Sequence, residues 1–254
     1  ERIAYLGLNS PELLILLFAC ARLGAMLLPL NWRLAMPELE YILDNAAPRL
    51  LVCDDEYFPV GEKLCGRRAG RMLCGHDHLA AGYQDGDFEW ADSQAGPASP
   101  MLLVYTSGTT GRPKGAVLTQ EAVLFNALNS VHMHGLDPTD HILTVLPMFH
   151  VGGLNIQTTP ALYVGATVTL HRRFDPGAVL SDIQALSPTR LVLVPATIMA
   201  LAADPQWAVT DLSSVRSVTT GSTIVPHSII ALFHDREVPV IQNYGLTAVS
   251  YTHL

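Results

Sequence analysis

Short apolar runs alternate with stretches of helical periodicity along most of this chain. The apolar runs predict buried strands at residues 3–8, 26–28, 50–53, 101–104, 116–118, 142–146, 166–170, 191–194, 215–219 and 240–242. The periodic stretches predict helices at about 11–24, 36–45, 120–134, 178–186, 196–203 and 226–234, and a strand-to-helix turn at 147–154 whose helix continues through residue 162. Strands that alternate with helices are typical of doubly wound sheets. We therefore predict an α/β fold of doubly wound parallel sheets with flanking helices.

Local signals fix the ends of the first predicted helix. Ser10 is a good N-cap, Pro11 suits the first helical position, and Glu12 suits the first turn. Residues 54–100 have no such pattern, because they are polar, glycine-rich and irregular. We expect this region to be a connection that holds one or two short strands.

The composition indicates a folded protein. The chain has 254 residues, of which 49% are hydrophobic and only 15% charged, enough for one large domain or two smaller ones. Its net charge of −8 comes from scattered acidic residues, which argues against a nucleic-acid partner. Residues 13–30 resemble a membrane span, but Arg22, Gly24 and Pro29 interrupt them, so we expect no transmembrane segment.

The cysteines favour a reducing compartment. There is no secretory signal, so the four cysteines predict a cytoplasmic protein rather than a disulfide framework (Cys20, Cys53, Cys65 and Cys74). Cys65 and Cys74 lie near His76 and His78, which raises the alternative of a zinc site. Their wide spacing lacks a Cys-x-x-Cys pair, so that alternative is disfavoured.

Residues 105–120 hold the densest chemistry of the chain, and we call them the glycine-threonine loop. They follow the apolar run 101–104, and residues 106–115 combine four hydroxyl residues, three glycines and two cations (Thr106, Ser107, Thr109, Thr110; Gly108, Gly111, Gly115; Arg112, Lys114). Glycine lets backbone N–H groups turn toward an anion, hydroxyls add donors, and Lys114 supplies a positive charge. The loop therefore predicts a polyphosphate site.

Two alternatives to this interpretation are weaker. A flexible surface loop would also be rich in such residues, but it would not need this ordered mixture of donors and cations. A Walker P-loop places Gly-Lys-[Ser/Thr] at the start of a helix. Here Lys114 is followed by Gly115 and the strand-like run 116–118, and a helix begins only after Thr119. A self-standing P-loop NTPase is therefore disfavoured.

Further loops follow the predicted strands at Pro147, Thr220 and Asn243. In doubly wound folds, ligands bind at the carboxyl ends of strands. Each site residue also has a plainer interpretation when taken alone. His150 could be a core or helix-start histidine, and Tyr244 could be a packing residue.

Taken in order, five stretches resemble the adenylate-forming superfamily of acyl- and aryl-CoA synthetases, luciferases and peptide-synthetase adenylation domains. They are residues 18–31, the loop 105–115, the aromatic-His segment 147–154, the adenine-side loop Thr220-Gly221-Ser222, and the nucleotide motif 243–247. The resemblance implies activation of a carboxylic acid by ATP with Mg²⁺, release of pyrophosphate, and transfer of the acyl group to a thiol, usually that of coenzyme A.

The resemblance also implies roles for individual residues. The loop from Thr106 through Ser107, Gly108, Thr109 and Thr110 to Gly111, together with Lys114, would hold the β- and γ-phosphates, and Thr106 is a candidate Mg²⁺ ligand. Tyr244, flanked by Asn243 and Gly245, would stack on adenine against Gly221 and Ser222. Thr247 would contact the α-phosphate, so the implied catalytic residues are Lys114, His150 and Thr247.

The acid side is implied by Phe149, His150, Gly152 and Gly153, with the two glycines leaving room beside the acyl tunnel. This segment has no Asp to pair with an α-amino group, so the resemblance implies a plain fatty or aryl (feruloyl-type) acid. The sequence defines neither its chain length nor the oligomeric state.

The chain departs from the family at its end. Ala248 stands where the family has a Glu that helps to bind Mg²⁺, and alanine cannot bind a cation. We interpret residues 1–254 as a partial N-terminal AMP-binding domain of two α/β subdomains without the small C-terminal domain, and inactive alone. Residues 248–254 also resemble a translated sequencing adapter, hence a non-native tail. The alternative is a non-catalytic ATP/AMP-binding module.

Overall fold

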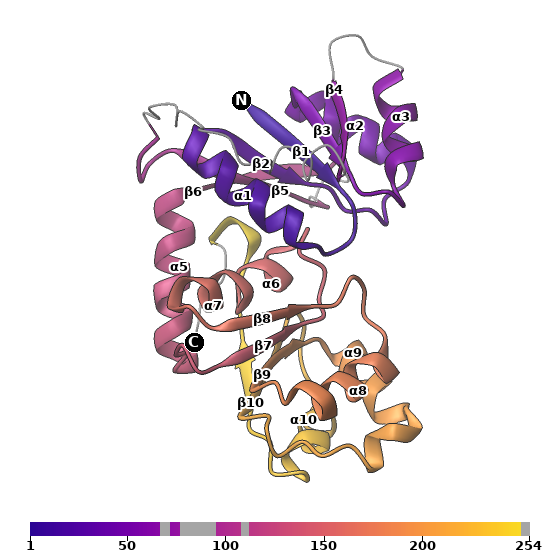
Figure 1. Ribbon diagram of the computed structural model, residues 1–254, viewed down its shortest axis with the longest axis vertical. Helices are drawn as coiled ribbons and strands as arrows, with labels where there is room; N and C mark the ends of the chain where they lie inside the picture. The colour runs from indigo at the N-terminus through magenta and orange to yellow at the C-terminus, as the bar shows by residue number, and fades with distance from the viewer. Residues whose placement is uncertain (67–71, 77–94, 108–111, 250–254) are drawn as a thin grey trace, which may run out of the picture. The chain divides into compact units, whose positions relative to one another are not determined.

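The computed structural model describes residues 1–66, 72–76, 95–107 and 112–249. The chain forms two compact units, Glu1–Val123 and Leu124–Leu254, each built on its own sheet (Figure 1). The division between them falls within helix α5 (Gln120–His134).

Six of the described strands form the sheet of the first unit. They are β1 (Arg2–Leu6), β2 (Met26–Pro29), β3 (Leu50–Cys53), β4 (Met72–Gly75), β5 (Pro100–Thr106) and β6 (Lys114–Thr119), in the order β4-β3-β1-β2-β5-β6. All neighbours are parallel except β5 and β6, which form an antiparallel hairpin at one edge. The glycine-threonine loop therefore comprises the end of β5, the connection between the two strands, and β6.

Helices cover the sheet of the first unit. Helix α1 (Pro11–Leu23) lies along β2 and β5 (Figure 1), and its N-cap is Ser10, whose Oγ accepts a hydrogen bond from Leu13 N at 3.4 Å. Helices α2 (Met36–Ala46) and α3 (Phe58–Gly66) pack on a buried core that includes Leu28, Leu43 and Leu51. Burial of these side chains is the main force that holds the unit together.

Helix α3 corrects the prediction for residues 54–100. We expected an irregular connection, but a helix forms at Phe58–Gly66 before the expected short strand β4. Gly61 weakens the helical pattern in the sequence. It is nevertheless needed, because a Cβ at this position would lie 2.5 Å from Cys53 Sγ. Burial of Leu64 against the sheet outweighs the poor local propensity.

The sheet of the second unit contains five of the described strands, all parallel. They are β7 (His141–Thr144), β8 (Thr167–Leu170), β9 (Arg190–Leu193), β10 (Ser217–Gly221) and β11 (Val240–Asn243), in the order β11-β10-β9-β7-β8. Because the strands are parallel, the segments that follow β7, β10 and β11 begin at the same edge of the sheet.

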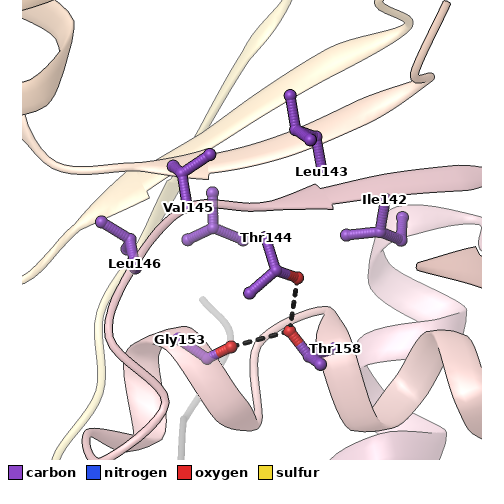
Figure 2. A pocket seen from close by; sticks show the side chains of 8 residues that line it. Ile142, Leu143, Thr144, Val145, Leu146, Gly153 and Thr158 are labelled. Atoms are coloured by element: carbon purple, nitrogen blue, oxygen red, sulfur yellow. Dashed lines mark hydrogen bonds between the residues drawn. The ribbon is translucent and has the colours of Figure 1, made fainter. Parts of the chain in front are cut away.

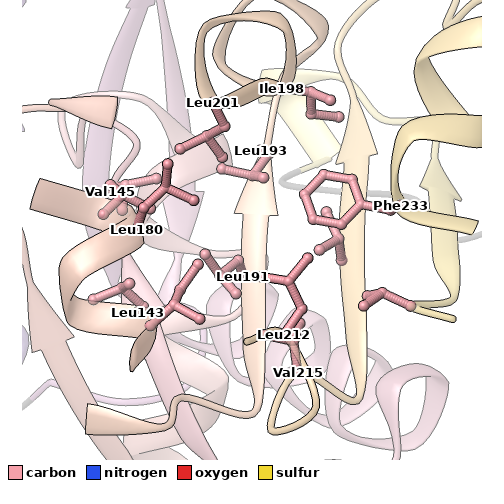
Figure 3. Close-up of a cluster of buried hydrophobic side chains, with 14 residues drawn as sticks. Leu143, Val145, Leu180, Leu191, Leu193, Ile198, Leu201, Leu212, Val215 and Phe233 are labelled. Carbon is pink, nitrogen blue, oxygen red and sulfur yellow. The ribbon is translucent and has the colours of Figure 1, made fainter. Parts of the chain in front are cut away.

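Two sets of helices pack on this second sheet. Helices α8 (Pro176–Leu186), α9 (Pro195–Ala203) and α10 (His227–His234) bury a core that includes Leu191, Leu193 and Phe233 (Figure 3). Helix α7 (Thr158–Val164) contributes Ala161 to a smaller cluster with Ile142 of β7. Short 3₁₀ turns η1 (Pro205–Ala208) and η2 (Thr247–Val249) complete the described elements.

The helix predicted to run through residue 162 is broken. Helix α6 (Val151–Leu154) ends at Asn155, and α7 begins only at Thr158. Polar side chains take the carbonyl groups that a continuous helix would use: Asn126 Nδ2 donates to the Asn155 carbonyl at 2.7 Å, and Thr158 Oγ1 donates to the Gly153 carbonyl at 2.7 Å (Figure 2). These bonds compensate for the interrupted helical ladder.

The predicted α/β class with parallel sheets and flanking helices is confirmed, and β6 is the antiparallel addition. Mixed sheets of this kind commonly carry one antiparallel edge strand. None of the helices in the described ranges is long and apolar enough to cross a bilayer.

Candidate functional site

The hairpin of β5 and β6 brings the two ends of the glycine-threonine loop together. Thr106 pairs with Lys114 across the hairpin, and both side chains are exposed, as is Ser107. Directly opposed residues of an antiparallel pair project from the same face. A hydroxyl group and an ammonium group therefore lie side by side at the mouth of the loop. Residues 108–111 (Gly108, Thr109, Thr110 and Gly111) fall outside the described residues.

Tyr105 anchors this hairpin to α2. Its hydroxyl donates to Asn45 Oδ1 at 2.5 Å, and burial together with the neighbouring Tyr41 raises the pKa of the phenol. The phenol is therefore neutral at physiological pH and acts as a donor. Its ring also lies against Gly115, where a Cβ would come within 3.1 Å of Tyr105 Cε2.

At the carboxyl edge of the second sheet, the backbones of β10 and β11 approach closely. Gly221 pairs with Asn243, and a Cβ at Gly221 would lie 2.4 Å from the Asn243 carbonyl oxygen. A backbone atom cannot move away as a flexible side chain can, so only glycine fits. Ser222 follows with φ 71°, a left-handed conformation that is uncommon for a residue with a side chain. Such strain is concentrated at functional sites.

An exposed aromatic ring follows this close approach. Tyr244 is 57% exposed, although Asn243 directly before it is buried. Gly245 and Thr247 are half-buried, and Thr247 begins the 3₁₀ turn η2. An exposed tyrosine beside the close approach of Gly221 to Asn243 offers a surface on which a planar ring can stack.

His150 is the N-cap of α6, at the same edge of the second sheet. Its Nδ1 accepts a hydrogen bond from Gly152 N at 3.0 Å, so that nitrogen carries no proton. His150 is exposed by its solvent-accessible surface. Desolvation by the surrounding protein nevertheless lowers the pKa of the imidazole below its usual range. The ring is therefore neutral near pH 7 and carries its proton on Nε2.

Gly153 has a packing role that is independent of any ligand. A Cβ at this position would lie 2.4 Å from the Pro147 carbonyl oxygen and 2.6 Å from that of Leu146. Phe149 is half-buried beside this turn, and Gly152 is buried. The strand-to-helix turn is thus tightly closed by backbone contacts.

The structure places one group of the predicted residues at the same edge of the second sheet. Gly221 and Asn243 end β10 and β11, Ser222 and Tyr244 directly follow them, and His150 lies in the turn after β7. The loop residues Thr106, Ser107 and Lys114 belong to the first unit and form their own cluster at the hairpin.

Two polar residues of the second unit were missed by the sequence interpretation. Gln157 and Thr219 are both almost fully buried, and Gln157 Nε2 donates to Thr219 Oγ1 at 3.1 Å. The signal that could have indicated them is the group of polar residues Asn155, Gln157, Thr158 and Thr159 inside a segment that we expected to be one continuous helix.

Thr106 is the one predicted ligand of Mg²⁺, and it does not form a site for the ion by itself. Thr106 offers one exposed hydroxyl, and Ala248 is exposed and offers no oxygen. Mg²⁺ prefers carboxylates in octahedral sites completed by water and phosphate oxygens. The donor set of this chain is therefore poorer than the ion requires.

The cysteine-histidine region shows contacts of other kinds. The His76 ring stacks on Tyr5 with 5.6 Å between ring centroids, and its Nδ1 lies 3.9 Å from Glu12 Oε2. The Cys74 thiol donates to the Gly75 carbonyl. Within the ranges that the structure describes, no three potential metal ligands gather at one point, and His78 lies outside those ranges.

The fold is that of the N-terminal domains of acyl-CoA synthetases. The inhibitor-bound N-terminal domain of FACL13 from Mycobacterium tuberculosis superposes with a TM-score of 0.90 at 29% identity, over 97% of this chain and 63% of that one. The anthranilate CoA ligase AuaEII in complex with anthranoyl-AMP gives a TM-score of 0.90 at 26% identity, over 99% of this chain and 50% of that one.

Residues 1–253 match the family described as AMP-binding enzyme, and the chain belongs to that family. It is 48% identical over 253 residues to an indoleacetate–CoA ligase of Aromatoleum aromaticum, covering 96% of this chain and 50% of that protein. It is 39% identical to a feruloyl-CoA synthase of Amycolatopsis, covering 97% and 49%. The predicted family is thus confirmed, and the chain spans about half the length of the curated relatives it matches.

Proposed function

We propose that the protein carrying this sequence is an AMP-forming acid–CoA ligase. It activates a carboxylic acid with ATP, releases pyrophosphate, and transfers the acyl group from the adenylate to the thiol of coenzyme A. The observation that carries the proposal is the edge of the second sheet, where neutral His150 follows β7, and the close approach of Gly221 to Asn243 and exposed Tyr244 lie at the ends of the neighbouring strands β10 and β11. Family membership supports the same reaction.

The nucleotide is assigned to two sets of residues. Tyr244 stacks on adenine, with Gly221 and Ser222 against the base and Asn243 and Gly245 shaping the turn. The hydroxyl and N–H groups of residues 106–111, together with Lys114, hold the β- and γ-phosphates. Thr247 offers its hydroxyl to the α-phosphate. These donors neutralise the charge that develops on the departing pyrophosphate, which is electrostatic catalysis by position.

His150 assists the acid as a neutral donor. Because Nδ1 accepts from Gly152, the proton on Nε2 is available to a carboxylate or acyl oxygen. One carboxylate oxygen then forms a bond to the α-phosphorus while the bond to the pyrophosphate oxygen breaks. In the second half of the reaction the coenzyme A sulfur forms the thioester bond, and the acyl–phosphate oxygen leaves with AMP.

Mg²⁺ supplies charge neutralisation when it enters with ATP. Thr106 is the only predicted ligand and offers one hydroxyl, so the phosphates would chiefly hold the ion. No step is assigned to the metal.

We also place the protein in the cytoplasm, because all four of its cysteines are free thiols.

An aryl acid is the favoured substrate. The relatives named for indoleacetate and ferulate are 48% and 39% identical to this chain, whereas a long-chain-fatty-acid–CoA ligase of Mycobacterium tuberculosis is 30% identical. A fatty acid is the less favoured alternative within the same reaction class.

Carboxylate-dependent exchange of pyrophosphate into ATP tests the proposal. The protein carrying this sequence at the length of its relatives is assayed with a panel of aryl and fatty acids. We expect exchange with at least one aryl acid and formation of its CoA thioester. Binding of ATP and AMP without exchange by any acid would contradict the proposal. That result would favour the non-catalytic binding module, which the absence of a carboxylate at Ala248 also suggests.

A further inference from the structure

A buried amide lies in the kink between α6 and α7. Gln157 is only 1% exposed, and its Nε2 donates to Thr219 Oγ1 at 3.1 Å. In the part of the chain that the structure describes, no donor reaches its Oε1. A buried amide oxygen without a donor is unfavourable, and native proteins rarely keep one without a ligand, a water molecule or a functional reason.

The kink holds this amide in place. Asn126 Nδ2 donates to the Asn155 carbonyl at 2.7 Å, and the Ser130 hydroxyl donates to the Ile156 carbonyl. Both donors come from α5 and fix the two residues directly before Gln157. These bonds fix the backbone before Gln157, and the bond from Nε2 to Thr219 holds its side chain, so the amide oxygen is a pre-organised acceptor.

The amide also lies on the sheet face that leads to the proposed acid site. Thr219 and Gly221 are two residues apart on β10, so alternation places them on the same face, about 7 Å apart along the strand. Gln157 contacts that face through Thr219. Its distance from the strand end is comparable to the length of an aryl-acetate whose carboxylate lies at the edge.

An adjoining pocket continues this face. Thr219 pairs in the sheet with Val192 of β9, and Val192 lines a pocket together with Thr144, Gly153 and Thr158 (Figure 2). The pocket is small, with room for about one water molecule, and its walls are chiefly apolar. The face thus combines one neutral acceptor with apolar surroundings.

We propose that Gln157 determines substrate specificity by accepting a hydrogen bond from a ring N–H or hydroxyl group of an aryl carboxylic acid. The inference rests on the proposed function, because the carboxylate must lie at the strand ends beside His150 for the ring to extend along this face. A neutral amide oxygen selects a neutral donor and rejects a ring that presents an acceptor, because two acceptors would then face each other in a buried site.

Matched pairs of acids test the inference in the ATP–pyrophosphate exchange assay. Indole-3-acetate is compared with benzofuran-3-acetate, in which an acceptor oxygen replaces the ring N–H, and 4-hydroxycinnamate is compared with cinnamate. We expect kcat/KM to favour the donor-bearing acid of at least one pair by about tenfold, as one neutral hydrogen bond allows. In Gln157→Met, which is apolar and of similar length, the two members of that pair should become equal.

Two controls separate the possible outcomes. Gln242→Met, at an exposed position of β11, should keep the discrimination of the wild type. Thermal unfolding should show that Gln157→Met remains folded, since removing an unpaired buried oxygen relieves a desolvation cost. Discrimination that is absent in the wild type, or unchanged in folded Gln157→Met, overturns the inference alone. Absence of exchange with every acid overturns the proposed function itself.

Discussion

The parallel strands of the second unit carry buried polar residues at both ends, and the two groups differ in how completely they are paired. At the amino ends, Asp140 accepts from Thr189 Oγ1 at 2.6 Å and lies 3.2 Å from Arg190 Nε, while Arg190 Nη1 donates to Ser217 Oγ at 3.0 Å. Toward the carboxyl ends, Gln157 Oε1 and Thr220 Oγ1 are buried, and neither has a partner within the described ranges.

The difference in pairing distinguishes residues that stabilise this sheet from residues that are available to a ligand. At the amino ends the opposite charges of Asp140 and Arg190 compensate each other, although Arg190 Nε itself makes no hydrogen bond within the described ranges. Such a charge-compensated cluster stabilises the fold and leaves little for a ligand to satisfy. Incompletely paired groups beside a tight glycine and an exposed aromatic ring destabilise the free protein, and a ligand can complete them. The amino edge is thus assigned to stability, and the carboxyl edge to binding.

The largest expected effect comes from breaking the amino-edge cluster. Asp140→Ala leaves the Arg190 guanidinium buried without its partner, which should lower the free energy of unfolding by about 3–5 kcal/mol. Urea denaturation at pH 7 measures the loss. Asp137→Ala is the matched control, because Asp137 lies 3.8 Å from Arg216 and is well exposed, so its loss should be much smaller. Equal losses would show that the buried cluster is not the stabilising element.

A second substitution tests the carboxyl edge. Gly221→Ala places a Cβ against the Asn243 carbonyl oxygen and should cost about 1–3 kcal/mol of stability, as overpacking generally does. Affinity for both ATP and AMP should fall, because the adenine-side turn must shift. Gly177→Ala in α8 is the control, since its nearest neighbour would lie at an ordinary 3.4 Å. Unchanged nucleotide affinity in Gly221→Ala would remove this edge from the binding site.

Many helices and strands could be predicted from the sequence, because the signals for them are local. Ser10 and Gly24 mark the ends of α1, and both predictions are confirmed by the cap geometry of the helix. Helix α3 escaped prediction because its stability comes from packing of Leu64 and Gly61 on the sheet, which no local pattern encodes.

The site residues differ in the same way, because some belong to local motifs and others depend on tertiary contacts. Lys114 and Tyr244 could be proposed as site residues because each belongs to a short motif of consecutive residues, which the family resemblance relates to nucleotide binding. The pair Gln157 and Thr219 could not, since its members are 62 residues apart and their contact depends on the break between α6 and α7. Long-range pairing of this kind is a product of tertiary structure.

A third prediction concerns the hairpin of the first unit, where we assign Lys114 to nucleotide binding. Lys114→Ala should weaken ATP binding about tenfold, because one charge-assisted bond to the β- and γ-phosphates is lost, while AMP binding should hardly change. Calorimetric titration with each nucleotide measures the two affinities. Lys63→Ala, an exposed lysine on α3, is the control. Equal losses for ATP and AMP would argue against the role assigned to Lys114.

The smallest effect concerns the pH dependence of the carboxyl edge. Desolvation lowers the pKa of His150 in the folded protein, so the unfolded chain binds its proton more readily. Stability should therefore be unaffected by this group above the ordinary imidazole pKa of about 6.5, and should fall as the pH drops below it. Protonation of Nδ1 also breaks the bond from Gly152 that caps α6.

In His150→Asn, whose side-chain oxygen can still cap the helix, the slope of stability against pH between about 7 and 5 should become shallower. A slope that His150→Asn does not alter would show that this histidine is not held in its neutral form by the fold.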